Sequence, residues 1–215
     1  MRFLIFVEGD TERAAVPAFL SGWLNQRVSS CVGVRPVRFK GCPHFLSEIR
    51  KIVHNMLEGP SSSEVIAGIG LLDLYGFPAF PEHLKSVGDR YAWAVEDIEG
   101  KVDHPKFRMY FAVYELEAWL LSQPEILPVS VQRALPKTTQ RPEDIDFDRP
   151  PSRLLQQLYS EKARCDYHKR VTGKALFAKL DPNVAYEKCP YLHRMLDDML
   201  RFARKAGLCE PVVLR

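Results

Sequence analysis

Three apolar runs in the first half of the chain carry the pattern of strands that are buried on both faces. Residues 2–7 (RFLIFV), 65–73 (VIAGIGLLD) and 107–115 (FRMYFAVYE) are almost continuously apolar. This pattern is typical of parallel sheets whose two faces are covered by helices. Residues 34–39 (VRPVRF) are predicted as a further strand of the same sheet.

Segments with helical periodicity follow these runs. They are predicted over residues 11–26, 41–59, 89–102 and 116–122. Strands that alternate with helices predict right-handed βαβ units and a parallel, doubly wound sheet. The expected fold class is therefore α/β and Rossmann-like.

The composition changes after residue 123. Six prolines fall within residues 124–152, which predicts an extended connection, and helical patterns return from about residue 152. We therefore predict an α/β core over 1–123, a proline-rich connection over 124–151 and a helical extension over 152–215 that packs on the core.

Composition and charge narrow the class of protein. Hydrophobic residues make up 46% of the chain and charged residues 27%, which is typical of a globular protein. The net charge of +3 is too small for a nucleic-acid coat protein, so any basic surface has to be local. Five scattered cysteines favour reduced thiols, and no apolar run approaches the ~20 residues of a membrane span. We expect a cytoplasmic protein that makes no contact with a membrane.

Three of the predicted strands end in an acidic residue: Glu8, Asp73 and Glu115. In an open parallel sheet, ligands bind outside the carboxyl ends of the strands, so these side chains are expected to converge there. Glu12 lies one helical turn after Glu8, and Glu117 follows Glu115. Clustered carboxylates need neutralisation, and Mg²⁺ or Mn²⁺ would provide it. Such a cation would support phosphodiester hydrolysis.

Other interpretations of the same residues stay open. Glu12 on its own is explained by the N-terminus of the following helix, and Asp73 on its own by a turn before Gly76. Three Cys/His pairs allow a zinc site, although none has paired C-x-x-C spacing. More commonly, such cysteines are buried thiols and such histidines lie on the surface. These pairs are Cys42 with His44, Cys165 with His168, and Cys189 with His193.

Basic residues gather in one stretch of the predicted extension. Such a stretch can follow a phosphate backbone, and a solvated helix face explains it equally well. The candidates for nucleic-acid binding are Lys162, Arg164, Arg170 and Lys174, and Lys169 lies in the same stretch.

Several motifs resemble the TOPRIM (topoisomerase–primase) domain, and within it the OLD-family nucleases. "VEGDTE" (7–12) resembles the first TOPRIM signature, and Asp73-Leu74-Tyr75 stands where that family has D-x-D. "YELEAWLLS" (114–122) resembles the acidic segment after the last strand. "YHKRVTGKALFAKL" (167–180) is similar to a Tyr-x-Lys…Gly element, and "CPYLHRMLDDML" (189–200) to a Cys-Pro-aromatic helix start. The whole chain looks similar to small bacterial TOPRIM-related proteins of unknown function.

The resemblance implies a role for each matching residue. Glu8 would be a metal ligand or general acid/base, and Glu12, Asp73, Glu115 and Glu117 would be further ligands. Lys169 would act as a catalytic residue that offsets the charge of the reacting phosphate. Tyr75 departs from the family, because a neutral tyrosine replaces the second acid of D-x-D.

Two functional hypotheses follow. The first is a Mg²⁺- or Mn²⁺-dependent nuclease, acting on DNA rather than RNA, in bacterial (phage) defence or DNA processing. The second, which Tyr75 favours, is a TOPRIM-like effector or sensor with weak or no catalysis that binds a partner ATPase or nucleic acid. A homodimer is a further expectation.

Overall fold

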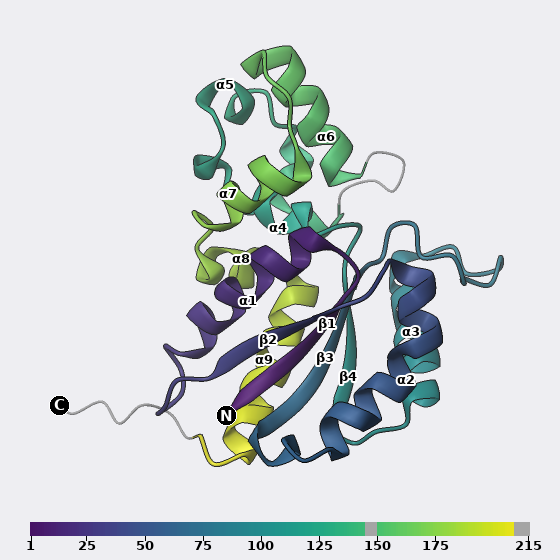
Figure 1. Ribbon diagram of the computed structural model, residues 1–215. Coiled ribbons are helices and arrows are strands. Elements are labelled where there is room, and N and C mark those ends of the chain that lie inside the picture. Colours follow the sequence, from purple (N-terminus) through teal and green to yellow (C-terminus); the bar gives the residue numbers. More distant parts are fainter. Residues whose placement is uncertain (145–149, 209–215) are drawn as a thin grey trace.

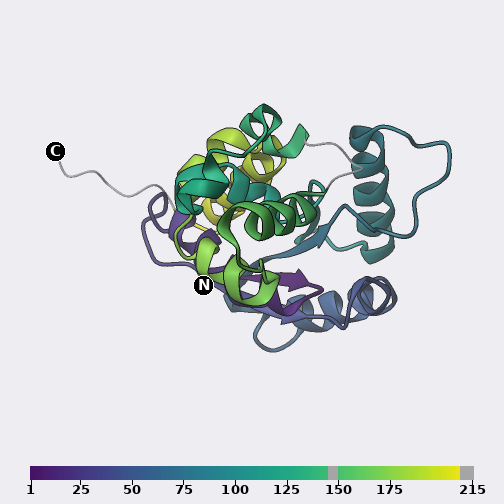
Figure 2. The ribbon, with the colours of Figure 1, turned by 90° about the horizontal axis from the view of Figure 1, so that it is seen from above.

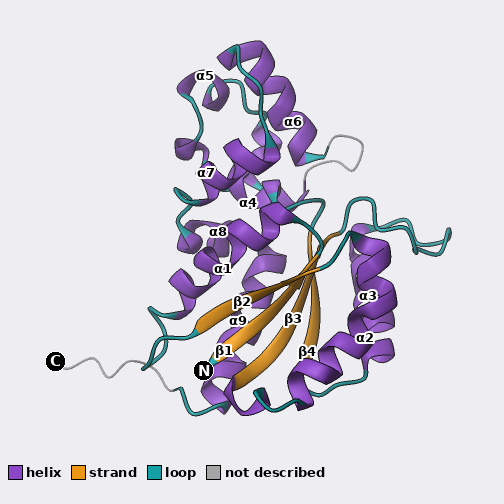
Figure 3. Ribbon diagram, in the orientation of Figure 1, coloured by secondary structure: helices purple, strands orange, loops and turns teal. Residues whose placement is uncertain are grey.

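A four-stranded parallel sheet forms the centre of the molecule in the computed structural model, which describes residues 1–144 and 150–208 (Figures 1 and 3). Residues 145–149 of the predicted connection and 209–215 of the predicted extension lie outside the described part. The strand order is β2-β1-β3-β4. The bounds are β1 Arg2–Val7, β2 Gly33–Arg38, β3 Val65–Asp73 and β4 Phe107–Ala112. The predicted α/β class is thus confirmed.

Helices follow each strand, as the periodicity predicted. The sheet-covering helices are α1 Asp10–Leu24, α2 Cys42–Glu58 and α3 Val87–Val102, and η1 is a short turn at Ser62–Glu64. After β4 come α4 Glu117–Leu121, η2 Pro124–Ile126, α5 Val129–Gln132, η3 Lys137–Gln140 and η4 Pro142–Asp144. The remainder consists of α6 Pro151–Leu158, η5 Tyr159–Ala163, η6 Lys169–Gly173, α7 Lys174–Phe177, α8 Pro182–Lys188 and α9 Pro190–Lys205.

The alternation of side chains along β1 divides the core into two layers. Phe3, Ile5 and Val7 belong to the cluster that includes buried residues of α1 and α9. Leu4 and Phe6 belong to the cluster on the opposite face, with α2 and α3. Figure 1 shows these two helix pairs on opposite sides of the sheet. The continuous apolar run of β1 therefore results from burial on both faces.

Two glycines of β3 make room for large side chains from the neighbouring strands. A Cβ atom on Gly68 would lie 2.8 Å from the Phe6 ring, and one on Gly70 would lie 2.5 Å from the Met109 sulfur. The glycines in "VIAGIGLLD" are therefore packing positions in a central strand.

Strand β4 is shorter than predicted. It ends at Ala112, and Tyr114 adopts a left-handed backbone with φ of 64°. This conformation is uncommon for a residue with a bulky side chain and turns the chain sharply. Glu115 consequently lies beyond a turn instead of at the last position of the strand.

The predicted proline-rich connection forms short helical segments, η2 to η4 and α5, in its described part. Leu127 and Val131 from this region are buried in the same cluster as Phe3 and Ile5. Helix α9 returns to the sheet and adds Leu192, Met195 and other residues to that cluster. The core is therefore continuous across the domain boundaries predicted from composition.

The segment after α6 is not one continuous helix. The π-helical turn η5 is followed by Arg164, which has a left-handed φ of 53°. A second π-helical turn, η6, begins at Lys169. Helices α5, α6 and α7 lie beyond the carboxyl ends of the strands (Figures 1 and 2). No helix in residues 1–144 and 150–208 is both long and apolar enough to cross a membrane.

Candidate functional site

The predicted acidic residues lie at the carboxyl edge of three neighbouring strands. Glu8 follows β1, Asp73 is the last residue of β3, and Glu115 and Glu117 follow β4. Strands β1 and β4 are the two neighbours of β3, so the order of the sheet brings the three strand ends side by side. We call Glu8, Glu12, Asp73, Glu115 and Glu117 the acidic cluster.

Lys169 reaches into the acidic cluster from the helical region beyond the sheet. Its Nζ lies 3.2 Å from Oδ2 of Asp73, 3.2 Å from Oε2 of Glu117 and 4.0 Å from Oε1 of Glu115. Burial alone would lower the pKa of Lys169, but the carboxylates of Asp73 and Glu117 raise it above the usual value. The lysine is therefore a fixed positive charge.

Asp73 holds two parts of the site together. One carboxylate oxygen contacts Lys169, and the other accepts a hydrogen bond of 3.0 Å from the backbone N–H of Leu116, at the start of α4. Burial raises the pKa of Asp73, Lys169 opposes the rise, and Glu117 and Glu12 add to it. The charged form of Asp73, whose side chain is largely buried, therefore depends on a neighbouring cation.

Glu117 is the most deeply buried acid of the cluster, with 1% of the residue exposed. The Tyr167 hydroxyl donates a hydrogen bond of 3.2 Å to Oε1. Oε2 forms an ion pair with the Lys169 ammonium at 3.2 Å. Burial raises the pKa of Glu117, and Lys169 lowers it.

Glu115 has a structural role that the sequence did not indicate. Its two oxygens accept hydrogen bonds from Ser152, one from the backbone N–H at 2.8 Å and one from the hydroxyl at 2.9 Å. Ser152 lies in the first turn of α6, where free N–H groups and the helix dipole favour an anion. Glu115 therefore anchors α6 over the edge of the sheet.

Glu8 and Glu12 form the β1 side of the cluster. Burial and the charge of Glu12 raise the pKa of Glu8, while Lys169 and a hydrogen bond from the Cys42 backbone lower it. Glu12 is buried and folds back over Gly9, where an added Cβ would lie 2.1 Å from its Oε2. Any larger residue at position 9 of "VEGDTE" would therefore displace the carboxylate of Glu12 from this position.

Asp10 lies between these two acids in the sequence, but its carboxylate forms ion pairs with arginines outside the acidic cluster. Its carboxylate pairs with Arg38 at 3.2 Å and with Arg13 and Arg170 at 3.7 Å. Arg13 and Arg38 were missed by the sequence analysis, because they lie far from the basic stretch that contains Arg170. Lys162, Arg164, Arg170 and Lys174 are all exposed.

The Tyr-x-Lys…Gly element has a physical explanation. Tyr167 holds Glu117 and Lys169 contacts both Glu117 and Asp73. A Cβ on Gly173 would lie 3.0 Å from the Tyr167 hydroxyl, so glycine leaves room for that ring. The sequence contained this signal, but it identified only Lys169 as a site residue.

The remaining candidates are more dispersed. The side chain of Tyr75 packs with the α2–α3 side of the core, and its backbone N–H donates to the Tyr114 carbonyl at 2.9 Å.

Two of the cysteines considered for a zinc site have a buried side chain or a raised thiol pKa. Cys189 is buried. Burial, together with the charge of Glu8, raises the pKa of Cys42 to about 11. Within the described residues, no group of three or more His, Cys, Asp or Glu side chains is arranged to hold a metal ion.

The acidic cluster contains the type of ligand that a hard cation prefers. Three of its carboxylates, those of Asp73, Glu115 and Glu117, lie within 4.0 Å of the Lys169 ammonium. Carboxylate oxygens are the ligands that Mg²⁺ and Mn²⁺ prefer. In the present arrangement, the Lys169 ammonium lies between the carboxylates of Asp73 and Glu117.

Comparisons with known proteins give a family and a set of similar structures. The family described as "Domain of unknown function (DUF4276)" matches residues 7–200. No curated protein matches the chain significantly. Among solved structures, the C-terminal region of the Burkholderia pseudomallei OLD protein is 17% identical, with a TM-score of 0.46, over 93% of this chain and 97% of that one. The C-terminal region of the Xanthomonas campestris pv. campestris OLD protein is 22% identical, with a TM-score of 0.43, over 95% and 97%. Likeness at this level carries no argument about chemistry.

Proposed function

The chain belongs to the DUF4276 family, and we propose that it hydrolyses phosphodiester bonds of nucleic acid with the help of Mg²⁺ or Mn²⁺. The observation that carries this proposal is the position of Lys169, 3.2 Å from both Asp73 and Glu117 at the carboxyl edge of the sheet. A buried cluster of acids with one fixed cation is an arrangement suited to phosphate chemistry. DNA is proposed over RNA, in bacterial defence or DNA processing, from the motif resemblance to OLD nucleases.

The metal would be held by the acidic cluster. Glu8, Asp73 and Glu117 are the primary candidates, and Glu12 is buried beside them. Glu115 is the weakest candidate, since both of its oxygens already accept hydrogen bonds from Ser152. A bound Mg²⁺ or Mn²⁺ would polarise the phosphate and lower the pKa of a bound water.

The side chains of the protein would supply the remaining chemistry. Lys169 places a positive charge where negative charge develops on the phosphate. Asp73 and Glu117 fix the position of this ammonium, and Tyr167 in turn fixes Glu117. Glu8 is proposed as the general acid/base, because its raised pKa lets it exchange a proton more readily near neutral pH.

The substrate backbone would lie along exposed basic side chains of the helical region. Lys162, Arg164, Arg170 and Lys174 are exposed and belong to the segment that contains Lys169. Arg170 shares Asp10 with Arg13 and Arg38. We propose these two arginines as additional phosphate contacts.

A cleavage assay tests the proposal. The purified chain is incubated with plasmid, single-stranded DNA and RNA, with Mn²⁺ or with a chelator. We expect cleavage only with the metal, and a loss of at least about 100-fold in Glu8→Gln and Asp73→Asn, by analogy with the removal of one electrostatic group from a site. Glu125→Gln is the matched control, since Glu125 is an exposed glutamate outside the acidic cluster. Cleavage that survives both site substitutions would contradict the assignment.

The absence of both cleavage and metal binding would instead support the effector hypothesis. Tyr75 in place of an acid is the observation that favours it. Binding of the purified chain to a candidate bacterial ATPase would then be measured. The ATPase partner and the homodimer are predictions that stand independently of catalysis.

A further inference from the structure

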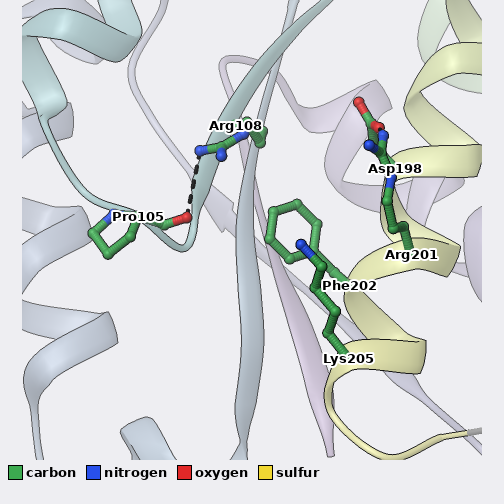
Figure 4. Close-up of a pocket in the computed structure, with 6 residues that line it drawn as sticks. All are labelled: Pro105, Arg108, Asp198, Arg201, Phe202 and Lys205. Carbon is green, nitrogen blue, oxygen red and sulfur yellow. Dashed lines mark hydrogen bonds and ion pairs between the residues drawn. The ribbon is translucent and has the colours of Figure 1, made fainter.

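A second polar cleft lies at the opposite end of the sheet from the acidic cluster. It has a volume of about 280 Å³ and lies between the start of β4 and the last turns of α9 (Figure 4). Its lining residues are Pro105, Arg108, Asp198, Arg201, Phe202 and Lys205. Three of these carry positive charge and one carries negative charge, so the cleft has an excess of two positive charges.

The single acid of the cleft is already engaged. Asp198 accepts a hydrogen bond of 2.6 Å from the Tyr110 hydroxyl, and it also forms an ion pair with Arg201. Tyr110 comes from β4 and Arg201 from α9, so this contact ties the two walls together. Figure 4 shows Arg201 directed toward Asp198.

Arg108 is held in place without losing its charge. Its Nη1 donates to the backbone carbonyls of Pro105 and Phe107, and its guanidinium lies 5.7 Å from the centre of the Phe202 ring. Carbonyls and an aromatic ring orient a cation without forming an ion pair. Outside the cleft lining, burial raises the pKa of Glu99 and the charge of Arg108 lowers it, without an ion pair between the two side chains among the described residues. Lys205 adds an exposed ammonium for which the described residues provide no ion pair.

We propose that this cleft binds a phosphate monoester. Two arginines and a lysine from two different elements provide the donors that phosphate favours. Phe202 forms an apolar wall against which the organic part of the ligand would lie. The volume is slightly below the range of about 300–1,000 Å³ typical of drug-sized ligands, so the cleft suits a small ligand.

Isothermal titration calorimetry of the full chain tests this proposal, with inorganic phosphate and 5′-AMP as the probes and no divalent metal present. We expect saturable binding of both probes, with AMP the tighter because of Phe202. The double variant Arg108→Gln/Lys205→Gln should weaken binding at least about tenfold. Glu8→Gln, at the other end of the sheet, should leave binding unchanged.

A matched variant separates a built site from general electrostatic attraction. Lys51→Gln/Lys85→Gln removes two exposed positive charges elsewhere on the surface. It should retain the affinity of the wild type. Equal weakening in the two double variants, or no saturable binding of either probe at millimolar concentration, would overturn the proposal. Neither result bears on metal-dependent cleavage at the acidic cluster, so the two proposals fail separately.

Discussion

Lys169 is the side chain that makes the acidic cluster compatible with a folded protein. Asp73 and Glu117 are largely buried, and burial raises the pKa of each. A buried carboxylate is costly unless a cation or hydrogen-bond donors compensate for the lost solvation. Lys169 compensates two carboxylates at once, at 3.2 Å from each.

Substitution of Lys169 by methionine should strongly reduce the proposed DNA cleavage. We expect the cleavage rate to fall at least about 100-fold, because one preorganised charge near the reacting phosphate is lost. The rate is measured as initial nicking of plasmid with saturating Mn²⁺. Lys162→Met is the control, since it removes an exposed lysine from the same segment. An equal loss in both variants would indicate that only general attraction to DNA was affected.

Tyr167 makes a smaller contribution through Glu117. Tyr167→Phe removes the hydroxyl that donates to the buried Oε1 of Glu117. We expect the free energy of unfolding to fall by about 1–3 kcal/mol, the usual cost of leaving a buried acceptor without a donor. Urea denaturation measures the change. Tyr159→Phe is the matched control, because Tyr159 is also buried and its ring lies 5.5 Å from that of Tyr167. A similar loss in the control would contradict this role of the hydroxyl.

Replacing glycine by alanine should have opposite effects on stability in strand β3 and in helix α1. Gly70→Ala places a Cβ 2.5 Å from the Met109 sulfur and 3.1 Å from the Phe107 ring. Overpacking of this kind costs about 1–3 kcal/mol. Gly22→Ala, inside α1, meets nothing within 4 Å and should stabilise by up to about 1 kcal/mol through helix propensity. Thermal unfolding of both variants tests the contrast, and a stabilised Gly70→Ala would show that β3 can shift.

The strands and helices of the first half were predicted well because each is encoded locally. The apolar run of β1 and the amphipathic pattern of α2 need only nearest neighbours along the chain to be recognised. The breaks at Tyr114 and Arg164 were not predicted, because neither residue type favours a left-handed backbone. At Tyr114, distant contacts accompany the turn, including the hydrogen bond from Leu116 to Asp73.

Glu143 links the predicted connection to the last helix. It is buried, and its carboxylate accepts hydrogen bonds from the backbone N–H groups of Tyr191 and Leu192, at 2.7 and 3.4 Å. These groups lie in the first turn of α9. Burial raises the pKa of Glu143 to about 7, and the hydrogen bonds oppose the rise.

This shift predicts a dependence of stability on pH. The folded protein retains the Glu143 proton at pH values where the unfolded chain, with a pKa of 4.5, has released it. The resulting stabilisation is complete below pH 4.5 and is lost as the pH rises to about 7. The shift corresponds to at most about 3 kcal/mol. Urea denaturation between pH 4 and 8 should show the wild type losing stability relative to Glu143→Gln as the pH rises. Glu125→Gln should follow the wild type, and parallel curves for the wild type and Glu143→Gln would contradict the assignment.

The alternation of strands and helices, and the acids at or shortly after the ends of β1, β3 and β4, were determined by the sequence alone. Both are local signals: an apolar run predicts a strand, and parallel strands place their carboxyl ends on one edge. Only the tertiary structure decided how these acids are used. In the folded chain, Lys169 forms ion pairs with Asp73 and Glu117, and Ser152 donates hydrogen bonds to Glu115. Three arginines form ion pairs with Asp10. Such pairings depend on how segments far apart in sequence pack together, and no local pattern encodes the distance between two side chains.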